Sequence, residues 1–346
     1  MRNIVTYEES LKEKNRIYID VRTREEHTEM TIPSSINLPI FTENERKIIG
    51  TEYMKGSKEK AKLLGITYAK DKLVSFFELF EKYKNEGRKI YIFCSRGGFR
   101  SKSIVGLFSS LGFPIYQIKG GYKSYRNFIN NNLNDLINSK SFISLYGYTG
   151  TGKTELLKKL EEKGYSILNL ENLANHKGSL LGGVLEKPQP SQKMFESLLY
   201  ESLLKSGSII FTEGESRKIG SLYLPNALYD KLLSSTKIEV VSSLDSRIKR
   251  IFDDYVKDND DELKEAIESL NRYISSKKVS LYKDLIDQKK YTDVIKNLII
   301  YYYDIKYSTK EKNFYYSISS DDKYSLSELE DIYRKVQKGI ICSEVV

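Results

Sequence analysis

Short apolar runs rich in β-branched and aromatic residues alternate with segments of helical period through the first 140 residues. Residues 17–21 and 90–93 are such runs and predict buried strands, and the segment 116–126 adds another strand and a Gly-Gly turn. Residues 71–87 and 101–111 have the period of amphipathic helices. Their predicted buried faces are Leu73, Phe76, Phe77, Phe80 and Tyr83 in the first helix, and Ile104, Val105, Phe108 and Leu111 in the second. This alternation predicts a small α/β domain with a parallel sheet.

The second part of the chain repeats the alternation after a polar stretch. Residues 122–140 have apolar positions at helical spacing and contain no Gly or Pro, so they predict a connecting helix rather than a flexible linker. We place a boundary near Ser139, which gives a first domain at 1–138 and a second at 139–346. Further strands are expected, with helices between them, at 142–146, 166–170, 208–212 and 237–242.

The part of the chain beyond residue 256 has mostly the period of amphipathic helices. Its apolar and aromatic stretch 298–307 is predicted to pack against the second sheet. The tyrosines of that stretch could also stack on unpaired bases.

Composition excludes several classes of protein. With 346 residues and 40% hydrophobic content, the chain can bury about two ordinary cores. No run approaches the ~18 apolar residues of a membrane span, and the first 15 residues lack the apolar region of a signal peptide. We therefore expect a cytoplasmic protein with no membrane contact. Two cysteines and two histidines indicate neither a disulfide framework nor a zinc site.

The net charge of +9 is unevenly distributed. Residues 1–140 hold 25 Lys and Arg against 16 Asp and Glu, whereas the remaining 206 residues hold 31 of each. A basic first domain favours an anionic partner there, such as nucleic acid or a small oxyanion. The alternative is that a Lys-rich surface reflects genome composition and solubility, and the abundance of Tyr, Lys and Asn favours that view.

A cysteine follows the strand 90–93 and begins a loop with anion-binding chemistry. The loop residues are Cys94, Ser95, Arg96, Gly97, Gly98, Phe99 and Arg100, and Ser101 is predicted to open a helix. The two glycines let successive N–H groups form a nest, and the nest, the helix N-terminus and the two arginines place the thiol in a positive field that favours thiolate. A buried core thiol is the alternative, but it needs neither nest nor cations. We predict a nucleophilic Cys94 facing an oxyanion, whereas Cys342 lies in a terminal segment and is interpreted as non-catalytic.

A second anion site is predicted where the strand 142–146 runs into GYTGTGKT at 147–154. This is the P-loop pattern G-x-x-x-x-G-K-[ST] between a strand and a helix. The phosphate-binding residues would be Gly147, Gly150, Thr151, Gly152, Lys153 and Thr154. The glycines let the backbone wrap a phosphate, Lys153 supplies a point charge, and Thr154 can hold Mg²⁺. The motif predicts a diphosphate or triphosphate and does not identify a nucleotide.

Carboxylates at the end of the third strand of the second domain are candidates for a metal role. Glu213 stands where a Walker-B acid would approach Mg²⁺, and Glu215 is the second choice. The alternative is an acidic loop paired with Arg217 and Lys218.

Other candidates lie in loops and on a helix of the second domain. His176, with Glu171 in the same segment, could be a phosphate donor or a general acid, or an exposed loop residue. Arg247 and Arg250 are three residues apart and would share a helix face, which suits phosphate or RNA, although a solvated face is the commoner use.

Several motifs of the first domain together resemble a rhodanese domain. They are the DVR motif at 20–22 with Glu25, the segment 32–39, the loop at 94–101 and KGG at 119–121. Asp20 could fix the active loop or pair with Arg22, and the alternative is a solvated salt bridge in a loop. The resemblance implies that the cysteine carries a transferable sulfur or attacks an oxyanion. The C-x5-R loop is one residue longer than is usual in sulfur-transferring rhodaneses and resembles that of rhodanese-fold phosphatases and arsenate reductases.

Along nearly all of its length, the chain resembles the bacterial tRNA 2-selenouridine synthases, in which a rhodanese domain is fused to a P-loop domain. The resemblance rests on the two anion loops, on LENLANHKGS at 170–179, on QPSQ at 189–192 and on EGESRKIG at 213–220. It implies a transferase that acts on 2-thiouridine at the wobble position of tRNA. Geranyl diphosphate would first alkylate the sulfur, and selenophosphate would then supply the selenium that replaces the S-geranyl group. A selenophosphate-supplying enzyme is a further partner that this chemistry admits.

The two co-substrates fit the two anion loops. A diphosphate leaving group suits 147–154, and the tetrahedral selenophosphate suits the longer loop at Cys94. Position alone makes Gly182, Gly183, Val184 and Leu185 candidates for an apolar geranyl slot.

Two alternatives from other functional classes stay open. One is a cysteine-dependent phosphatase or arsenate reductase fused to a nucleotide-dependent kinase or switch, which would turn over ATP without tRNA. The other is a non-catalytic tRNA-binding or sulfur-relay module whose P-loop is a nucleotide-gated switch. That module would bind ATP or GTP tightly and release no modified nucleoside.

Overall fold

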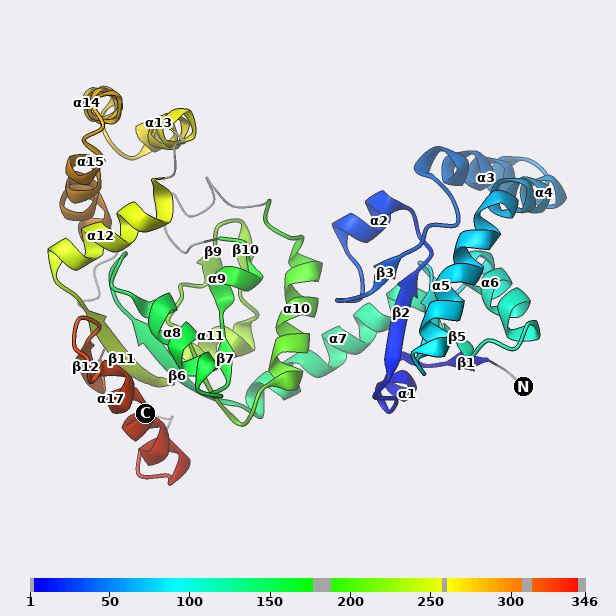
Figure 1. Ribbon diagram of the computed structural model, residues 1–346, viewed down its shortest axis with the longest axis horizontal. Helices are drawn as coiled ribbons and strands as arrows, with labels where there is room; N and C mark the ends of the chain where they lie inside the picture. Colours follow the sequence, from blue (N-terminus) through cyan, green and yellow to red (C-terminus); the bar gives the residue numbers. More distant parts are fainter. Residues whose placement is uncertain (1–2, 177–187, 257–259, 307–312, 342–346) are drawn as a thin grey trace. The chain divides into compact units, whose positions relative to one another are not determined.

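The computed structural model describes residues 3–176, 188–256, 260–306 and 313–341 (Figure 1). The chain forms two compact units, Met1–Leu133 with Pro190–Glu201, and Asn134–Gln189 with Ser202–Val346. Each unit contains a five-stranded parallel sheet, which confirms the predicted α/β class. The domain boundary near Ser139 stays a prediction, and the segment Pro190–Glu201 belongs to the first unit although it follows residues of the second.

The first sheet has the strand order β1-β5-β4-β2-β3. Its strands are β1 (Ile4–Val5), β2 (Arg16–Asp20), β3 (Ile36–Asn37), β4 (Lys89–Phe93) and β5 (Ile115–Ile118). All neighbouring pairs are parallel. In the central strand β4, every residue after Lys89 is buried, as expected for a parallel strand covered on both faces. The carboxyl end of this strand therefore carries the Cys94 loop.

Helices cover this sheet and include the predicted amphipathic pair. They are α1 (Tyr7–Leu11), α2 (Arg24–Glu29), α3 (Glu43–Lys55), α4 (Lys58–Ala69), η1 (Lys70–Lys72), α5 (Leu73–Asn85), α6 (Phe99–Ser110) and α7 (Gly121–Asn138). The rings of Phe76, Phe80 and Phe108 pack together between α5 and α6. Phe77 and Leu111, predicted to be buried, are 42% and 55% exposed, because each lies beyond the edge of its helix's buried face.

The second sheet has the order β12-β11-β6-β8-β7 and is also parallel. Its strands are β6 (Ser141–Tyr146), β7 (Ile167–Leu168), β8 (Ile209–Glu213), β11 (Thr236–Val241) and β12 (Tyr316–Ser319). The strand predicted at 166–170 is shorter, because Asn169 caps a short helix by accepting a hydrogen bond from the backbone N–H of Asn172 at 2.7 Å. A separate antiparallel pair, β9 (Lys218–Ile219) and β10 (Leu222–Tyr223), follows β8.

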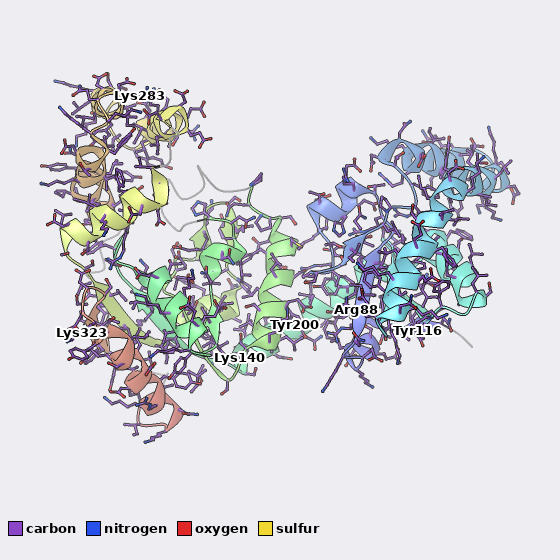
Figure 2. All side chains as sticks on the ribbon, in the orientation of Figure 1. Arg88, Tyr116, Lys140, Tyr200, Lys283 and Lys323 are labelled. Carbon is purple, nitrogen blue, oxygen red and sulfur yellow. The ribbon has the colours of Figure 1, made fainter. Side chains whose placement is uncertain are left out.

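The helices associated with this sheet are α8 (Lys153–Glu162), α9 (Leu170–Leu173), α11 (Asn226–Leu233), α12 (Leu244–Tyr255) and α17 (Ser325–Gln337). Helix α10 (Gln192–Lys205) lies mostly in the segment that belongs to the first unit. A further group contains α13 (Asp260–Ser269), η2 (Leu270–Arg272), α14 (Ser276–Asp287), α15 (Tyr291–Leu298), the π-helix η3 (Ile299–Tyr303) and α16 (Asp304–Lys306). We call α12 to α16 the helical group. Charged side chains lie on its outer faces, such as Lys283 of α14, which pairs with Glu268 of α13 (Figure 2).

The helical group has a hydrophobic core of its own. This core contains Ile267, Leu270, Val279, Tyr282, Ile286, Val294, Leu298, Tyr302 and Tyr303, and it is distinct from the cluster that covers the second sheet. The prediction that the stretch 298–307 packs against the second sheet is therefore wrong for its described residues. Its apolar side chains instead pack against the apolar faces of the short helices α13 and α14, within the core of the helical group.

No helix within the described ranges combines the length and the apolar character needed to cross a membrane.

Candidate functional site

The thiol of Cys94 lies directly after β4 and is almost fully buried. Its Sγ is 3.2 Å from the hydroxyl of Ser101, in the first turn of α6. The side-chain amide of Gln117, on β5, donates to that hydroxyl at 2.8 Å and to the carbonyl of Gly97 at 2.9 Å. Ser101 accepts from Gln117, and its own proton can go to the sulfur or to the carbonyl of Gly98, which lies 3.4 Å from its Oγ. Gln117 was missed by sequence reasoning, although a Gln inside an apolar strand is a signal of a buried polar role.

The loop after Cys94 is held in one conformation by the start of α7. Tyr122 N–H donates to the carbonyl of Cys94 at 2.8 Å, and Lys123 N–H donates to that of Ser95 at 3.0 Å. Gly97 and Gly121 have φ values of +64° and +59°, and a Cβ on Gly121 would overlap the carbonyl oxygen of Cys94. The glycines are therefore required by both conformation and space.

Backbone donors of this loop are available to an anion. The N–H groups of Arg96, Gly97 and Gly98 have no hydrogen-bond acceptor in the part of the chain that the structure describes. They precede α6, which begins at Phe99 rather than at the predicted Ser101. Three successive donors ahead of a helix N-terminus are what the predicted nest for an oxyanion requires, and binding of an anion there stays a prediction.

The two loop arginines differ in their surroundings. Arg100 donates to Glu26 at 2.7 Å and to the hydroxyl of Ser95 at 2.8 Å, so its charge is balanced by a carboxylate that sequence reasoning did not select. Burial opposes ionisation of Glu26, but the hydrogen bond and charge of Arg100 outweigh it and lower the pKa of Glu26. Arg96, in contrast, is exposed. Phe99 is 60% exposed and makes an edge contact with the ring of Tyr53.

Asp20 supports the Cys94 loop indirectly, through Arg22 and Tyr122. It is fully buried and binds Arg22 at 2.7 Å, so the alternative of a solvated salt bridge is wrong. Burial opposes its ionisation, yet hydrogen bonds from His27 and Arg22 lower the pKa of Asp20. The guanidinium of Arg22 lies 4.5 Å from the ring centre of Tyr122, whose N–H holds the carbonyl of Cys94. The ion pair thus acts on the thiol loop through Tyr122.

The second predicted anion loop connects β6 to α8. Gly150 and Gly152 have φ values of +80° and +87°, as a backbone that curls around a phosphate requires. The ammonium of Lys153 donates to the carbonyl oxygens of Gly147 at 2.8 Å and Tyr148 at 3.2 Å. Thr151 is buried and its hydroxyl donates to Tyr148 at 2.9 Å, so it shapes the loop.

Arg247 and Arg250, predicted to share a helix face, both contact this loop from α12. Arg247 donates to the carbonyl of Thr149 at 2.9 Å and forms a bidentate pair with Asp304 at 2.6 and 2.9 Å. Arg250 lies near Gly150 and also contacts Glu155 at 3.3 Å. A solvated helix face is therefore not their environment, since Arg247 is buried and both guanidinium groups have several partners.

Comparison with known proteins matches both units of this arrangement. Residues 5–128 match the family model of the rhodanese-like domain, and residues 140–285 match that of the tRNA 2-selenouridine synthase AAA domain. The tRNA 2-selenouridine synthase of Shewanella frigidimarina is 36% identical over 248 residues, 70% of this chain and 66% of that protein. The enzyme of the same name from Nitrosomonas eutropha is 34% identical over 69% of this chain and 62% of that protein.

The chain belongs to the tRNA 2-selenouridine synthase family. The matched region spans just under two thirds of the length of these relatives. Among solved structures, the N-terminal domain of a protein from Clostridium difficile 630 described as ATP/GTP binding is 41% identical, with a TM-score of 0.35, over 36% of this chain and 98% of that one.

Three carboxyl groups lie near Lys153 of the P-loop, in the part of the chain that matches the synthase family model. They belong to Glu171, Glu213 and Glu215. Glu213 is the last residue of β8; its Oε2 accepts from the backbone N–H of Leu170 at 2.9 Å, and its Oε1 has no hydrogen-bond partner. Burial, reinforced by the charge of Glu215, raises the pKa of Glu213 to about 8. Burial and the charges of Glu215 and Glu213 raise the pKa of Glu171 well above its usual value, and Lys153 opposes both shifts. Glu213 therefore keeps its proton at neutral pH.

These side chains could bind Mg²⁺ only in its usual manner, in which the protein supplies one or two of the ligands. Within the described ranges, no set of three or more His, Cys, Asp or Glu could hold a metal. The unpartnered, buried oxygen of Glu213 and the exposed hydroxyl of Thr154 suit a cation that takes most of its ligands from phosphate and water.

The remaining signatures of the synthase family are structural neighbours in the second unit. Gln189 donates to the carbonyls of Ala174 and Ile219, each at 3.1 Å, and accepts from Ser221 N–H at 2.7 Å. A Cβ on Gly220 would overlap Gln189 and the ring of His176, so that ring is packed rather than fully exposed. Gln189, the first residue of the QPSQ motif, thus connects the end of α9 at Ala174 to the turn between β9 and β10.

Arg217 and Lys218 have neighbours of another kind. Arg217 donates to Asn226 at 2.7 Å, and Lys218 lies over the ring of Tyr223 at 5.3 Å. The candidates for a geranyl slot at 182–185 lie outside the described residues, as does Cys342. The catalytic and binding roles assigned from sequence stay predictions.

Gly121→Ala should destabilise the first unit and disrupt the thiol loop. The added Cβ would overlap the carbonyl of Cys94 in a backbone conformation that disfavours side chains, and we expect a loss of about 3 kcal/mol in the free energy of unfolding. Urea denaturation followed by circular dichroism measures it. Gly106→Ala is the matched control, because Gly106 lies in α6 with open space around it. Equal stability of the two variants would contradict this account of the loop.

Glu213 should make the second unit less stable as pH rises. Below its usual pKa of 4.5 the group is protonated in both states; between that value and about 8 only the folded state keeps the proton. The free energy of unfolding should therefore fall over this range, by about 5 kcal/mol at most. Glu213→Gln removes the titration, so this variant should gain stability relative to the parent as pH rises from 5 to 9. Denaturation at several pH values tests this, with Glu161→Gln, an exposed carboxylate on α8, as control; a pH-independent difference for Glu213→Gln would refute it.

Proposed function

We propose that this chain converts 2-thiouridine at the wobble position of tRNA into 2-selenouridine. The observation that carries the proposal is a buried thiol bordered by three free backbone donors, in a chain that also contains a P-loop and aligns with proteins named tRNA 2-selenouridine synthase. A packing thiol would need no such donors. The excess of 25 basic over 16 acidic residues at 1–140 suits an RNA substrate.

The first step is S-geranylation at the P-loop. The thione sulfur of the base attacks C1 of geranyl diphosphate, the carbon–oxygen bond breaks, and inorganic diphosphate leaves with its electron pair. The base loses its N3 proton and becomes the S-geranyl derivative. Charge grows on the departing diphosphate, where Lys153 and the loop amides would stabilise it. Mg²⁺, when bound through Thr154 and Glu213, would neutralise part of that charge.

The second step replaces the S-geranyl group with selenium from selenophosphate. The N–H groups of Arg96, Gly97 and Gly98 would hold the tetrahedral oxyanion beside the sulfur of Cys94. Ser101, which accepts from Gln117, would donate to that sulfur and stabilise its anionic form. The selenium of selenophosphate attacks C2 of the base, the C2–S bond breaks and geranyl thiol leaves; water then cleaves the Se–P bond and releases inorganic phosphate. Cys94 either holds the selenium species in place or assists the attack at C2. A selenophosphate-supplying enzyme would deliver the donor in the cytoplasm.

A second candidate function is nucleotide turnover at the P-loop, combined with oxyanion chemistry at Cys94. It is favoured by the backbone of the P-loop and the ammonium of Lys153, because a nucleoside triphosphate would meet the same donors as a prenyl diphosphate. The discriminating experiment is nucleoside analysis of tRNA incubated with the protein, geranyl diphosphate and selenophosphate. ATP hydrolysis without tRNA, and no selenium in the tRNA, would favour the second candidate.

Cys94→Ser should abolish selenation and leave geranylation within about twofold of the parent rate. Removal of a nucleophile typically lowers a rate by several orders of magnitude, so we expect selenation to fall roughly a thousandfold or more. Mass spectrometry of tRNA nucleosides distinguishes the S-geranyl and selenium products. Cys342→Ser, the other cysteine of the chain, is the matched control. Normal selenation by the Cys94 variant would remove the role assigned to the thiol.

Lys153→Ala should impair the use of geranyl diphosphate. Loss of one donor to a developing charge typically lowers a rate about a hundredfold, and we expect geranylation to fall by that order. Selenation of tRNA that already carries the S-geranyl group should continue. Lys158→Ala, at an exposed position of the same helix, is the control. Unchanged geranylation by the Lys153 variant would exclude the P-loop as the diphosphate site.

A further inference from the structure

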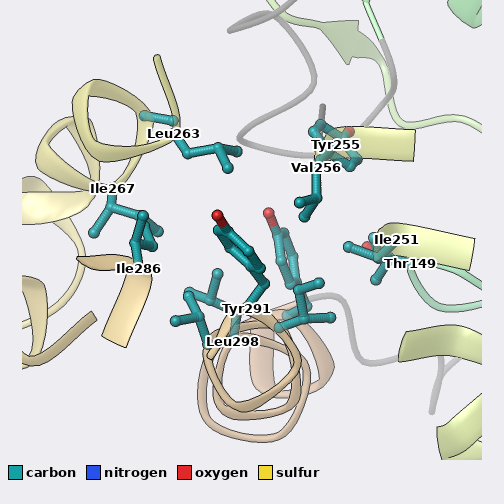
Figure 3. Close-up of a pocket in the computed structure, with 13 residues that line it drawn as sticks. Thr149, Ile251, Tyr255, Val256, Leu263, Ile267, Ile286, Tyr291 and Leu298 are labelled. Atoms are coloured by element: carbon teal, nitrogen blue, oxygen red, sulfur yellow. The ribbon is translucent and has the colours of Figure 1, made fainter. Parts of the chain in front are cut away.

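A cavity lies inside the helical group of the second unit. Its volume, measured as the space open to the centre of a water-sized sphere, is about 60 Å³. Leu263, Ala266 and Ile267 of α13 line one side, and Val294 and Leu298 of α15 line another. Figure 3 shows apolar side chains and aromatic rings directed into this space.

One wall of the cavity is the P-loop itself. Thr149, inside the GYTGTGKT motif, lines the cavity next to Ile251 of α12 (Figure 3). A Cβ on Gly150 would lie 3.0 Å from the Cδ1 atom of Ile251, so this cavity residue already packs against the loop. The hydrogen bond from Arg247 to the carbonyl of Thr149 fixes α12 to the same place. An anion held by the loop therefore has an apolar chamber beside it.

Two polar side chains at or beside the cavity are already paired with the protein. Tyr291 donates its hydroxyl to Asp260 at 2.7 Å, and the guanidinium of Arg247 is satisfied by Asp304. The aromatic ring of Tyr303 reaches the cavity from a π-helix, an irregularity that is frequent at functional sites. A nucleobase would leave its own hydrogen-bonding groups without partners in such a chamber, whereas a hydrocarbon would not.

We propose that this cavity binds the hydrocarbon tail of a prenyl diphosphate whose head group is held by the P-loop. The inference rests on the proposed function and deepens it, because it assigns the tail to the helical group and not to 182–185. A ten-carbon chain contributes affinity through burial of its methylene and methyl groups, and the wall positions set the length that fits. The P-loop then selects for charge, and the helical group selects for the tail.

Binding by the full-length protein tests the proposal without any variant. Isothermal titration in the presence of Mg²⁺ should show that geranyl diphosphate binds at least tenfold more tightly than inorganic diphosphate. The five-carbon dimethylallyl diphosphate should lie between them. Equal affinity for all three ligands would overturn the proposal, since the tail would then contribute nothing.

Ala266→Phe tests the location, because the added ring fills the cavity from α13. We expect it to reduce the preference for geranyl over inorganic diphosphate by at least tenfold, with the affinity for inorganic diphosphate unchanged. Glu265→Phe adds the same ring at the neighbouring exposed position and should keep the parent's preference. Unchanged diphosphate binding also reports that the loop and helices remain folded; if it is lost, Val294→Phe on α15 repeats the test from the opposite wall.

The outcomes separate this inference from the proposed function. If the parent protein geranylates tRNA and both cavity variants keep its full preference, the cavity assignment is wrong and the function stands. If the parent transfers no geranyl group and binds ATP more tightly than geranyl diphosphate, both the function and the inference fail.

Discussion

Both predicted anion sites depend on one constraint of parallel sheets: the chain must leave a central strand at its carboxyl end and turn at once toward a helix. In the first unit this turn runs from β4 to α6, and in the second from β6 to α8. Backbone N–H groups at the start of a helix have no partners within it, so each turn concentrates donors where the strand ends. Glycines with positive φ, such as Gly97 and Gly150, make the turns tight enough for the donors to converge.

The two sites differ in how their carboxylates are balanced. In the first unit Asp20 and Glu26 have arginine partners, so both carboxylates stay charged and hold the loop as structural anions. In the second unit burial raises the pKa of Glu213 and of Glu171, and Lys153 is a nearby cation that opposes both shifts. The first site is therefore fixed before any ligand arrives. The second has a charge state that a cation or a phosphate would change.

The sequence predicted what depends on neighbouring residues, namely the strands, the loop glycines, Cys94 and the P-loop. It could not predict Gln117 or Glu26 as partners of the thiol loop, because these contacts join segments 20 to 74 residues apart. The separate core of the helical group was missed for a similar reason. Helical period shows which face is apolar but not which other face covers it, so 298–307 was assigned to the sheet. Strand β7 was predicted too long because an Asn cap ends it earlier than hydrophobicity indicates.

The hydrogen bonds of Lys153 to its own loop have a consequence for selectivity. A ligand that recruits this ammonium must compete with two carbonyl oxygens that already hold it. A terminal diphosphate carries enough charge to do so, whereas each phosphodiester of an RNA backbone carries a single negative charge shared between two oxygens. The resting lysine thus sets a threshold of charge density, and a polyanion can pass close to the loop without occupying it.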